Sequence, residues 1–397
     1  MKMDKYKKVY LKKGKEQSLD RFHPWVFSGA IAHLDDGIEE GETVDVFSAN
    51  GRFIAVGHYQ IGSIAVRVLS FDDCDINSDY WFSSLKGALN MRIALGLADG
   101  RAGDTYRLVH GEGDFLPGLV IDVYGKTAVM QAHSVGMHIH RNEISHELLA
   151  VMGGRIDNVY YKSETTLPYK AELGQEDGFL CGGDADNVAV ENGLKFYVDW
   201  LKGQKTGFFI DQRDNRSLLE HYASGRNVLN MFCYTGGFSV YAMRGGAAAV
   251  HSVDSSAKAI ELTEKNVELN FPGDKRHVAY CDDAFKFLDN VADKYNLIVL
   301  DPPAFAKHRA ALHNALKGYT RLNAKALEKI QPGGILFTFS CSQVVTKDNF
   351  RNAVFTAAAV ARRKVRILHQ LHQPADHPIN IYHPEGEYLK GLVLYVE

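Results

Sequence analysis

The strongest constraint on the fold is a regular alternation of strands and helices from about residue 195 to the last residue. Short apolar runs bounded by turn residues alternate there with amphipathic segments, as in successive strand–helix–strand units. Such units build a mostly parallel sheet with helices on both faces. The seven predicted strands are 227–233, 250–254, 277–281, 296–300, 334–340, 365–371 and 392–396.

The length of 397 residues predicts more than one domain, since a domain has about 100–200 residues. The first 70 residues show short alternating strands between Gly, Ser and Asn turns, which predicts a small barrel or sandwich. We therefore expect a multidomain α/β protein in three parts. A β-rich barrel spans 1–70, a small central α+β domain spans 76–194, and a Rossmann-like domain with a mostly parallel seven-stranded sheet spans 195–397.

Composition excludes several classes of protein. Hydrophobic residues make up 46% and charged residues 23%, as in ordinary globular proteins. No stretch approaches the roughly 18 apolar residues of a membrane span, so no membrane partner is expected. The five cysteines are odd in number and scattered, and the histidines lack metal-site spacing. We expect a cytoplasmic protein without disulfides or a bound metal.

A basic segment at the N-terminus contrasts with the net charge of −3. Residues 1–21 hold seven lysines and Arg21 against three acidic residues, a local charge of +5. Such a patch either attracts a nucleic acid or is a solvated terminal face, and the segment alone leaves both interpretations open.

The predicted cofactor site lies at three successive strand ends. The first strand of the last domain ends in Thr235-Gly236-Gly237 and opens directly into a helix. Ligands of open α/β sheets bind at this edge, where glycines permit close approach of the backbone. The next strand ends in Asp254, and the one after it ends in Asp282-Asp283, followed by Ala284. Carboxylates at these positions can accept hydrogen bonds from ribose hydroxyls.

This order favours a ligand with ribose and adenine but no phosphates, such as S-adenosylmethionine. A nicotinamide cofactor is disfavoured because the three-glycine fingerprint is absent. Each aspartate alone is equally typical of a helix cap. The preceding segment LKGQKTGFFIDQRDNR, with Phe209, Asp211 and Arg213, is either a lid over the cofactor or a capped helix start.

The predicted chemical site lies on the fourth and fifth strands. The fourth delivers Asp301, and the rigid Pro302-Pro303 pair follows with Phe305 positioned to face a planar group. Cys341 ends the neighbouring fifth strand. A thiolate there is suited to add to carbon 6 of a pyrimidine, which makes carbon 5 nucleophilic enough to accept a methyl group. The alternatives are a proline-stopped strand and a small buried cysteine.

These segments together resemble a known family. HPWVFSGA, KTGFFIDQRDNR, VLNMFCYTGGFSV, DPPAF, FTFSCS, DHP and EGEYLKG are similar to motifs of the bacterial large-subunit (23S) rRNA cytosine-C5 methyltransferases over essentially the full length. The resemblance implies an N-terminal PUA domain, a central domain and a class I S-adenosylmethionine-dependent methyltransferase domain. It also implies that Cys341 is the nucleophile, that the glycine turn and Asp211, Arg213, Asp254 and Asp283 contact the cofactor, and that ribosomal RNA contacts Arg21, His23 and Trp25.

One position departs from related enzymes. Many cytosine-C5 RNA methyltransferases carry a second cysteine in the DPP-like motif that helps to release the product, and this chain has none there. The release step therefore needs another base. A base-nitrogen RNA methyltransferase and a non-catalytic RNA-binding assembly factor remain alternatives, a nicotinamide oxidoreductase ranks last, and the choice between monomer and homodimer stays open.

Overall fold

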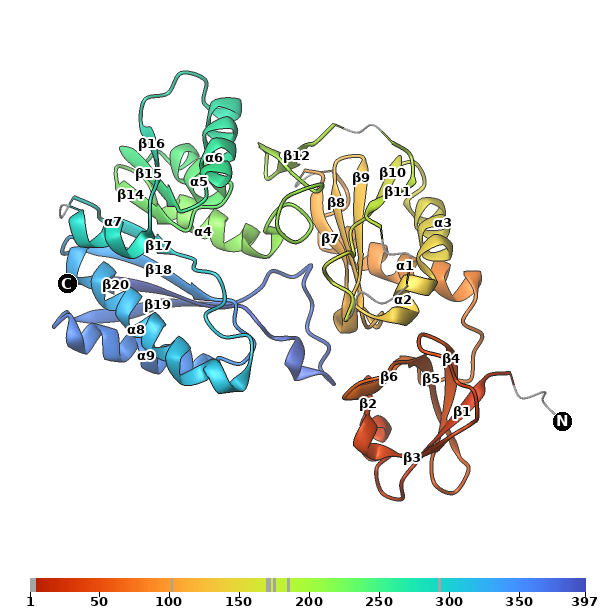
Figure 1. Ribbon diagram of the computed structural model, residues 1–397. Helices are drawn as coiled ribbons and strands as arrows, with labels where there is room; N and C mark the ends of the chain where they lie inside the picture. The colour runs from red at the N-terminus through yellow and green to blue at the C-terminus, as the bar shows by residue number, and fades with distance from the viewer. Residues whose placement is uncertain (1–4, 101–102, 169–172, 174–175, 184–185, 292–293) are drawn as a thin grey trace. The chain divides into compact units, whose positions relative to one another are not determined.

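The computed structural model describes residues 5–397 except 101–102, 169–172, 174–175, 184–185 and 292–293. The chain forms two compact units (Figure 1). The first unit comprises 1–193, 198–210 and 375–386, and the second comprises 194–197, 211–374 and 387–397. Lys2 and Asp4 of the basic segment lie outside the described residues. The division into three domains stays a prediction, but two short segments predicted for the last domain belong to the first unit.

The N-terminal part of the first unit contains a six-stranded sheet of order β2-β6-β5-β4-β1-β3. Its strands are β1 (Lys7–Leu11), β2 (Trp25–Phe27), β3 (Ile31–Leu34), β4 (Thr43–Phe47), β5 (Phe53–Tyr59) and β6 (Ile64–Ser70). Alternating residues such as Val44 and Val46 are fully buried and build its core with Val9 and Leu11. The alternation predicted from the sequence therefore reflects a sheet with one buried face.

The remaining part of the first unit packs helices on a five-stranded sheet of order β11-β10-β9-β8-β7. Its elements are α1 (Ser78–Ala94), β7 (Thr105–His110), β8 (Leu119–Tyr124), β9 (Thr127–Ala132), α2 (Val135–Ile139), α3 (Arg141–Met152), β10 (Asn158–Tyr161) and β11 (Gly178–Cys181), followed by β12 (Val188–Glu191). Leu85 and Leu89 of α1 and Ile144 and Leu148 of α3 belong to the same buried core as residues of the sheet.

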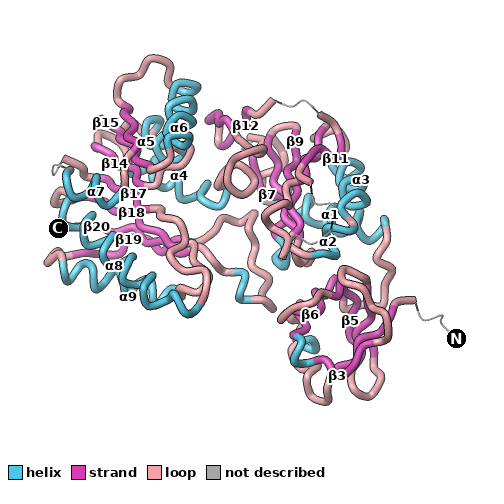
Figure 2. Tube along the Cα trace, in the orientation of Figure 1, coloured by secondary structure: helices cyan, strands magenta, loops and turns pink. Residues whose placement is uncertain are grey.

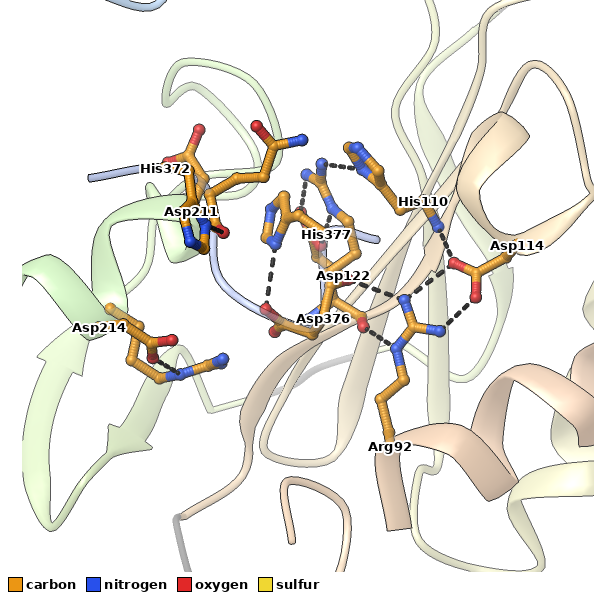
Figure 3. A network of polar contacts seen from close by, with 12 residues as sticks. Arg92, His110, Asp114, Asp122, Asp211, Asp214, His372, Asp376 and His377 are labelled. Carbon is orange, nitrogen blue, oxygen red and sulfur yellow. Dashed lines mark hydrogen bonds and ion pairs between the residues drawn. The ribbon is translucent and has the colours of Figure 1, made fainter. Parts of the chain in front are cut away.

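Residues 375–386, which Figure 2 draws largely as loop, are anchored to the first unit by buried polar groups. Arg92 is fully buried on α1 and donates to both carboxylate oxygens of Asp114 and, at 2.7 Å, to the carbonyl of Asp376 (Figure 3). The backbone amide of Arg107 donates to Asp376 Oδ2 at 3.0 Å. Because buried charges need partners, these bonds fix the path of the loop.

The second unit contains a seven-stranded sheet of order β16-β15-β14-β17-β18-β20-β19. The strands are β14 (Asn227–Met231), β15 (Ala249–Asp254), β16 (His277–Cys281), β17 (Leu297–Leu300), β18 (Gly334–Ser340), β19 (Val365–Leu371) and β20 (Lys390–Val396), and a short β13 (Leu194–Tyr197) precedes them. Only β20 runs antiparallel to its neighbours. The predicted fold class, a mostly parallel seven-stranded sheet, is confirmed.

Helices cover both faces of this sheet, with α5 and α6 on one side and α8 and α9 on the other (Figure 1). The helices are α4 (Arg213–Tyr222), α5 (Gly237–Arg244), α6 (Ala257–Asn270), α7 (Ala284–Asn290), α8 (Leu312–Lys329) and α9 (Lys347–Val360). Consequently β17 and β18 are buried along their whole length, which explains their uninterrupted apolar sequences. Within the described ranges, no helix combines the length and apolar character that a membrane span requires.

Candidate active site

The glycine turn after β14 has an unusual backbone. Tyr234 has a φ of 48° and Gly236 a φ of 78°, and Gly236 caps the N-terminus of α5. A Cβ on Gly236 would lie 2.7 Å from Thr263 Cγ2, so no larger residue fits without displacing α6. The amide of Tyr234 donates to Asp254 Oδ2 at 3.0 Å, which ties this turn to the end of β15. The turn thus presents its backbone at the carboxyl edge of the sheet.

The predicted carboxylates lie at neighbouring strand ends. Asp254 is half-buried, accepts from the Ser256 amide at 2.9 Å, and pairs in register with Cys281, which directly precedes Asp282. Asp282 is exposed, and Asp283 caps α7 by accepting two backbone amides at 3.0 Å. Asp283 therefore has a structural role as a cap, and its contact with the cofactor stays a prediction. Two further predicted residues, Thr235 and Ala284, are buried beside this edge.

The predicted lid segment divides between the two units. Phe209 belongs to the first unit, where Lys205 lies 4.6 Å above its ring, whereas Asp211 and Arg213 belong to the second. Asp211 is buried and accepts a hydrogen bond of 2.8 Å from the Tyr388 hydroxyl. Arg213 is the first residue of α4 and is also buried. The structure therefore shows the predicted helix start, with buried polar side chains, and the lid over the cofactor stays a prediction.

Asp301 follows β17 and is held in place by a side chain from before α4. Gln212 Nε2 donates to Asp301 Oδ2 at 3.0 Å. Of the two prolines that follow, Pro302 is buried and Pro303 is exposed. The half-buried ring of Phe305 packs on Tyr319 with 4.6 Å between ring centroids. One side of Phe305 therefore packs on the buried Tyr319, and the ring stays a candidate surface for a base.

Cys341 directly follows β18, the parallel neighbour of β17, and is half-buried. The serines on either side of it are buried and hydrogen-bonded. Ser340 Oγ donates to the Tyr319 hydroxyl at 2.9 Å, and Ser342 Oγ donates to the carbonyl of Ala306. These bonds attach the Cys341 loop to α8 and to the Asp301–Ala306 loop, so the two predicted chemical residues come from adjacent, mutually braced loops.

The predicted RNA contacts lie in the first unit, whereas Asp301 and Cys341 lie in the second. Arg21 is exposed, but Trp25 is half-buried. The Trp25 indole donates to Glu112 Oε1 at 2.9 Å, and its ring lies 4.3 Å from that of His383. Trp25 therefore helps to bind residues 375–386 to the sheet, which limits the part of its ring that can reach a partner.

His23, His383 and Glu385 bring possible metal-ligand atoms within 4.8 Å of one another. The amide of Trp25 donates to His23 Nδ1 at 3.3 Å. Neutral His23 then carries its proton on Nε2, the nitrogen that lies 3.7 Å from Glu385 Oε1. A metal-binding histidine needs the reverse arrangement, so this geometry fits a histidine–carboxylate contact rather than metal ligation.

Four residues of the site were not predicted, namely Gln212, Tyr319, Tyr388 and Lys390. Three of them lie inside the recognised segments KTGFFIDQRDNR and EGEYLKG. Their position in those segments is the signal by which they could have been predicted, because their residue types alone do not indicate a functional role. Burial raises the pKa of Tyr319 to about 12, so its hydroxyl stays protonated while it accepts the hydrogen bond from Ser340.

Comparison with protein families identifies both parts of the chain. Residues 178–381 match a model of S-adenosylmethionine-dependent methyltransferases, and residues 9–71 match a PUA-like domain. The second match confirms the PUA-like fold predicted for the N-terminal sheet. The first confirms the predicted cofactor, since methyltransferases of this family depend on S-adenosylmethionine.

Curated relatives match over nearly the full length. A protein of Tolumonas auensis is 41% identical over 97% of this chain and 98% of its own. A protein of Shewanella denitrificans is 39% identical over 98% of this chain and 99% of its own. Both are named ribosomal RNA large subunit methyltransferase I.

Solved structures show the same fold at lower identity. A protein of Streptococcus mutans described as a SAM-dependent methyltransferase aligns with a TM-score of 0.83 at 23% identity over 98% of this chain and 99% of its own. A methyltransferase structure containing S-adenosylhomocysteine aligns with a TM-score of 0.84, also at 23% identity and over the same shares of the two chains.

Proposed function

The chain belongs to the S-adenosylmethionine-dependent methyltransferases, among relatives named ribosomal RNA large subunit methyltransferase I, and from this premise we propose that it methylates carbon 5 of a cytosine in large-subunit ribosomal RNA. One observation supports the choice of carbon 5. Cys341 stands at the end of β18, beside the strand that ends at Asp301. A base nitrogen is already nucleophilic and needs no thiol, whereas carbon 5 of cytosine must first be activated.

The cofactor fits the edge formed by β14, β15 and β16. The turn at Gly236 offers backbone groups, and Asp254 and Asp282 offer carboxylates suited to ribose hydroxyls. S-Adenosylmethionine bound there supplies a methyl group from its sulfonium sulfur and is left as S-adenosylhomocysteine. We assign cofactor contacts to these residues and to Asp211 and Thr235.

The chain's own residues then perform the remaining steps. The target cytosine leaves its stack to reach the loops after β17 and β18. The Cys341 thiolate forms a bond to carbon 6, and the electron pair of the 5,6 double bond moves to carbon 5. Asp301 hydrogen-bonds the ring nitrogen or amine of the base. Once carbon 5 carries the methyl group, the hydrogen of carbon 5 leaves as a proton to water. The 5,6 double bond then re-forms, and the bond between sulfur and carbon 6 breaks to return the thiolate.

Covalent trapping tests this proposal. In RNA that contains 5-fluorocytidine, fluorine takes the place of the proton that must leave, so the cysteine adduct accumulates. We expect wild-type protein and Cys281→Ser, which changes the exposed cysteine that ends β16, to form an adduct stable in denaturing gels. Cys341→Ser should form none and should produce no 5-methylcytidine.

The competing function is methylation of a base nitrogen, because a DPP segment followed by an aromatic residue also suits an amine held against a methyl donor. Mass spectrometry of digested RNA separates the two. An N-methylated nucleoside made equally well by wild type and Cys341→Ser, without an adduct, would replace the carbon-5 assignment. Cofactor binding without any methylated product would favour a non-catalytic role.

A further inference from the structure

A buried lysine lies next to the proposed nucleophile. Lys390 begins β20 and is only 4% exposed. Its register partner on the antiparallel strand β18 is Ser340, the residue directly before Cys341. Lysine is almost never fully buried without a group that compensates its charge. The position of Lys390 beside Cys341 therefore calls for an explanation.

The hydrogen bonds of Lys390 aim its amino group at the Cys341 loop. Lys390 Nζ donates to the carbonyl of Ser342 and to that of Tyr388, both at 2.6 Å. Both acceptors are neutral backbone oxygens, and one belongs to the residue directly after Cys341. The four-carbon side chain is thus fixed at both ends, with its charge at the loop that carries the thiol.

Charged and titratable groups from several parts of the second unit surround this pair. Cys341, Glu387 and Lys347 influence Lys390, and Glu387 already forms an ion pair of 2.5 Å with Lys347 on α9. Near Cys341 stand the neutral Tyr319 of α8 and Asp301 after β17, which binds Gln212. Burial lowers the pKa of Lys390 to about 8, and the nearby thiol opposes that shift. A lysine with this lowered pKa gives up its proton more readily than an exposed lysine does.

We propose that Lys390 is the positioning residue of Cys341, which takes the thiol proton and stabilises the thiolate with its ammonium group. In this step the S–H bond breaks and an N–H bond forms on the Lys390 amine, so the pair changes from thiol and amine to thiolate and ammonium. The thiolate compensates the buried cation, and the cation lowers the energy of the thiolate. This role rests on the proposed function, in which Cys341 is the nucleophile.

The test measures the reactivity of Cys341 without RNA. Full-length protein is alkylated with iodoacetamide from pH 5.5 to 10, and the rate at Cys341 is read from its peptide by mass spectrometry. In wild type we expect a midpoint below the value of about 8.5 for an ordinary thiol. An ordinary midpoint in wild type would overturn the proposal whatever the variants do.

Three variants separate charge from packing. Lys390→Met keeps much of the volume, and we expect it to raise the midpoint by about one pH unit or more, with about a tenfold slower reaction at pH 7. Lys390→Arg retains the charge, so the midpoint of its alkylation profile should stay close to that of wild type. Lys364→Met, which changes an exposed lysine of the same unit, should match wild type. A midpoint that Lys390→Met leaves unchanged would refute the role.

The alkylation profile tests the role of Lys390, and the methylation product tests the proposed function, so either proposal can be refuted without the other. If wild type makes no 5-methylcytidine but Lys390→Met still shifts the Cys341 midpoint, the proposed function is wrong and the coupling of the two residues stands. If wild type makes 5-methylcytidine through Cys341 and the midpoint does not respond to Lys390→Met, the function stands and Lys390 is structural.

Discussion

Gln212 Nε2 donates a 3.0 Å hydrogen bond to Asp301 Oδ2, so a neutral side chain from before α4 holds the carboxylate at the end of β17. The amide orientation of Gln212 is itself fixed, because its Oε1 accepts from Asn215 Nδ2 at 2.7 Å. Both amide residues are buried. This chain of hydrogen bonds holds the Asp301 carboxylate in one orientation.

Replacing Gln212 by methionine removes the donor and keeps the side-chain length. A hydrogen bond to a charged group contributes about 1.5–3 kcal/mol, so we expect a loss of about 10- to 100-fold in kcat/KM for methylation of unmodified rRNA. Binding of S-adenosylhomocysteine, measured by calorimetry, should change little. Gln370→Met on the exposed surface of β19 is the control. Full activity of Gln212→Met would show that Asp301 needs no support.

Gly236→Ala tests whether the turn after β14 has room for a side chain. Both Gly236 and Gly273 have positive φ angles, 78° and 73°, so alanine at either position costs about 1–2 kcal/mol. Only at Gly236 does the new Cβ meet a neighbour, 2.7 Å from Thr263. We expect S-adenosylhomocysteine to bind at least about tenfold more weakly to Gly236→Ala. Gly273→Ala should bind normally, and equal affinities would contradict a cofactor role for the turn.

The sheet of the second unit was predictable because each of its strands leaves a local signal. β16, β18 and β19 match the predicted ranges to the residue, and the uninterrupted apolar sequence of β18 is typical of a strand buried on both faces. β2 and β3 were not predicted, because three or four residues are too short to show alternation. The contacts of residues 375–386 with the first unit were not predicted for another reason: their anchors, such as Arg92, are almost 300 positions away in the chain.

In the site, too, residues that depend on contacts with distant parts of the chain could not be predicted from the sequence. Strand order alone predicts that Asp254, Asp301 and Cys341 share one edge of the sheet, because parallel strands end together. It does not predict Gln212 or Lys390, whose importance comes from long-range contacts with Asp301 and with the Cys341 loop. A lysine in a sequence is usually exposed, and only the antiparallel pairing of β20 with β18 buries this one.

Asp114→Ala should strongly destabilise the first unit. It leaves the fully buried Arg92 guanidinium without its carboxylate, and breaking such a pair costs about 3–5 kcal/mol. All three tryptophans lie in the first unit, so their fluorescence during urea unfolding reports on it. Asp20→Ala breaks an exposed pair with Arg52 and should cost less than about 1 kcal/mol. Similar costs for the two variants would refute the structural role of Arg92.

His58 should make the first unit sensitive to acid. It is buried on β5, and its ring stacks on that of His140 with 5.2 Å between centroids. Burial, His140 and Arg67 lower the pKa of His58 from 6.5 to about 3. Below pH 6.5 the unfolded chain therefore binds a proton at His58, whereas the folded chain binds it only near pH 3. The free energy of unfolding consequently falls as the pH drops from 6.5 towards 3, and His58 has no such effect above pH 6.5.

Between pH 7 and pH 5 this single residue should remove roughly 2 kcal/mol from the free energy of unfolding. His58→Gln cannot take up the proton, so its stability should fall less over the same interval, whatever constant cost the substitution adds. His146→Gln changes an exposed histidine and should keep the wild-type pH dependence. Urea unfolding followed by tryptophan fluorescence at pH 5, 6 and 7 measures all three proteins. Parallel curves for wild type and His58→Gln would mean that His58 is protonated in the folded chain, against its burial beside Arg67 and His140.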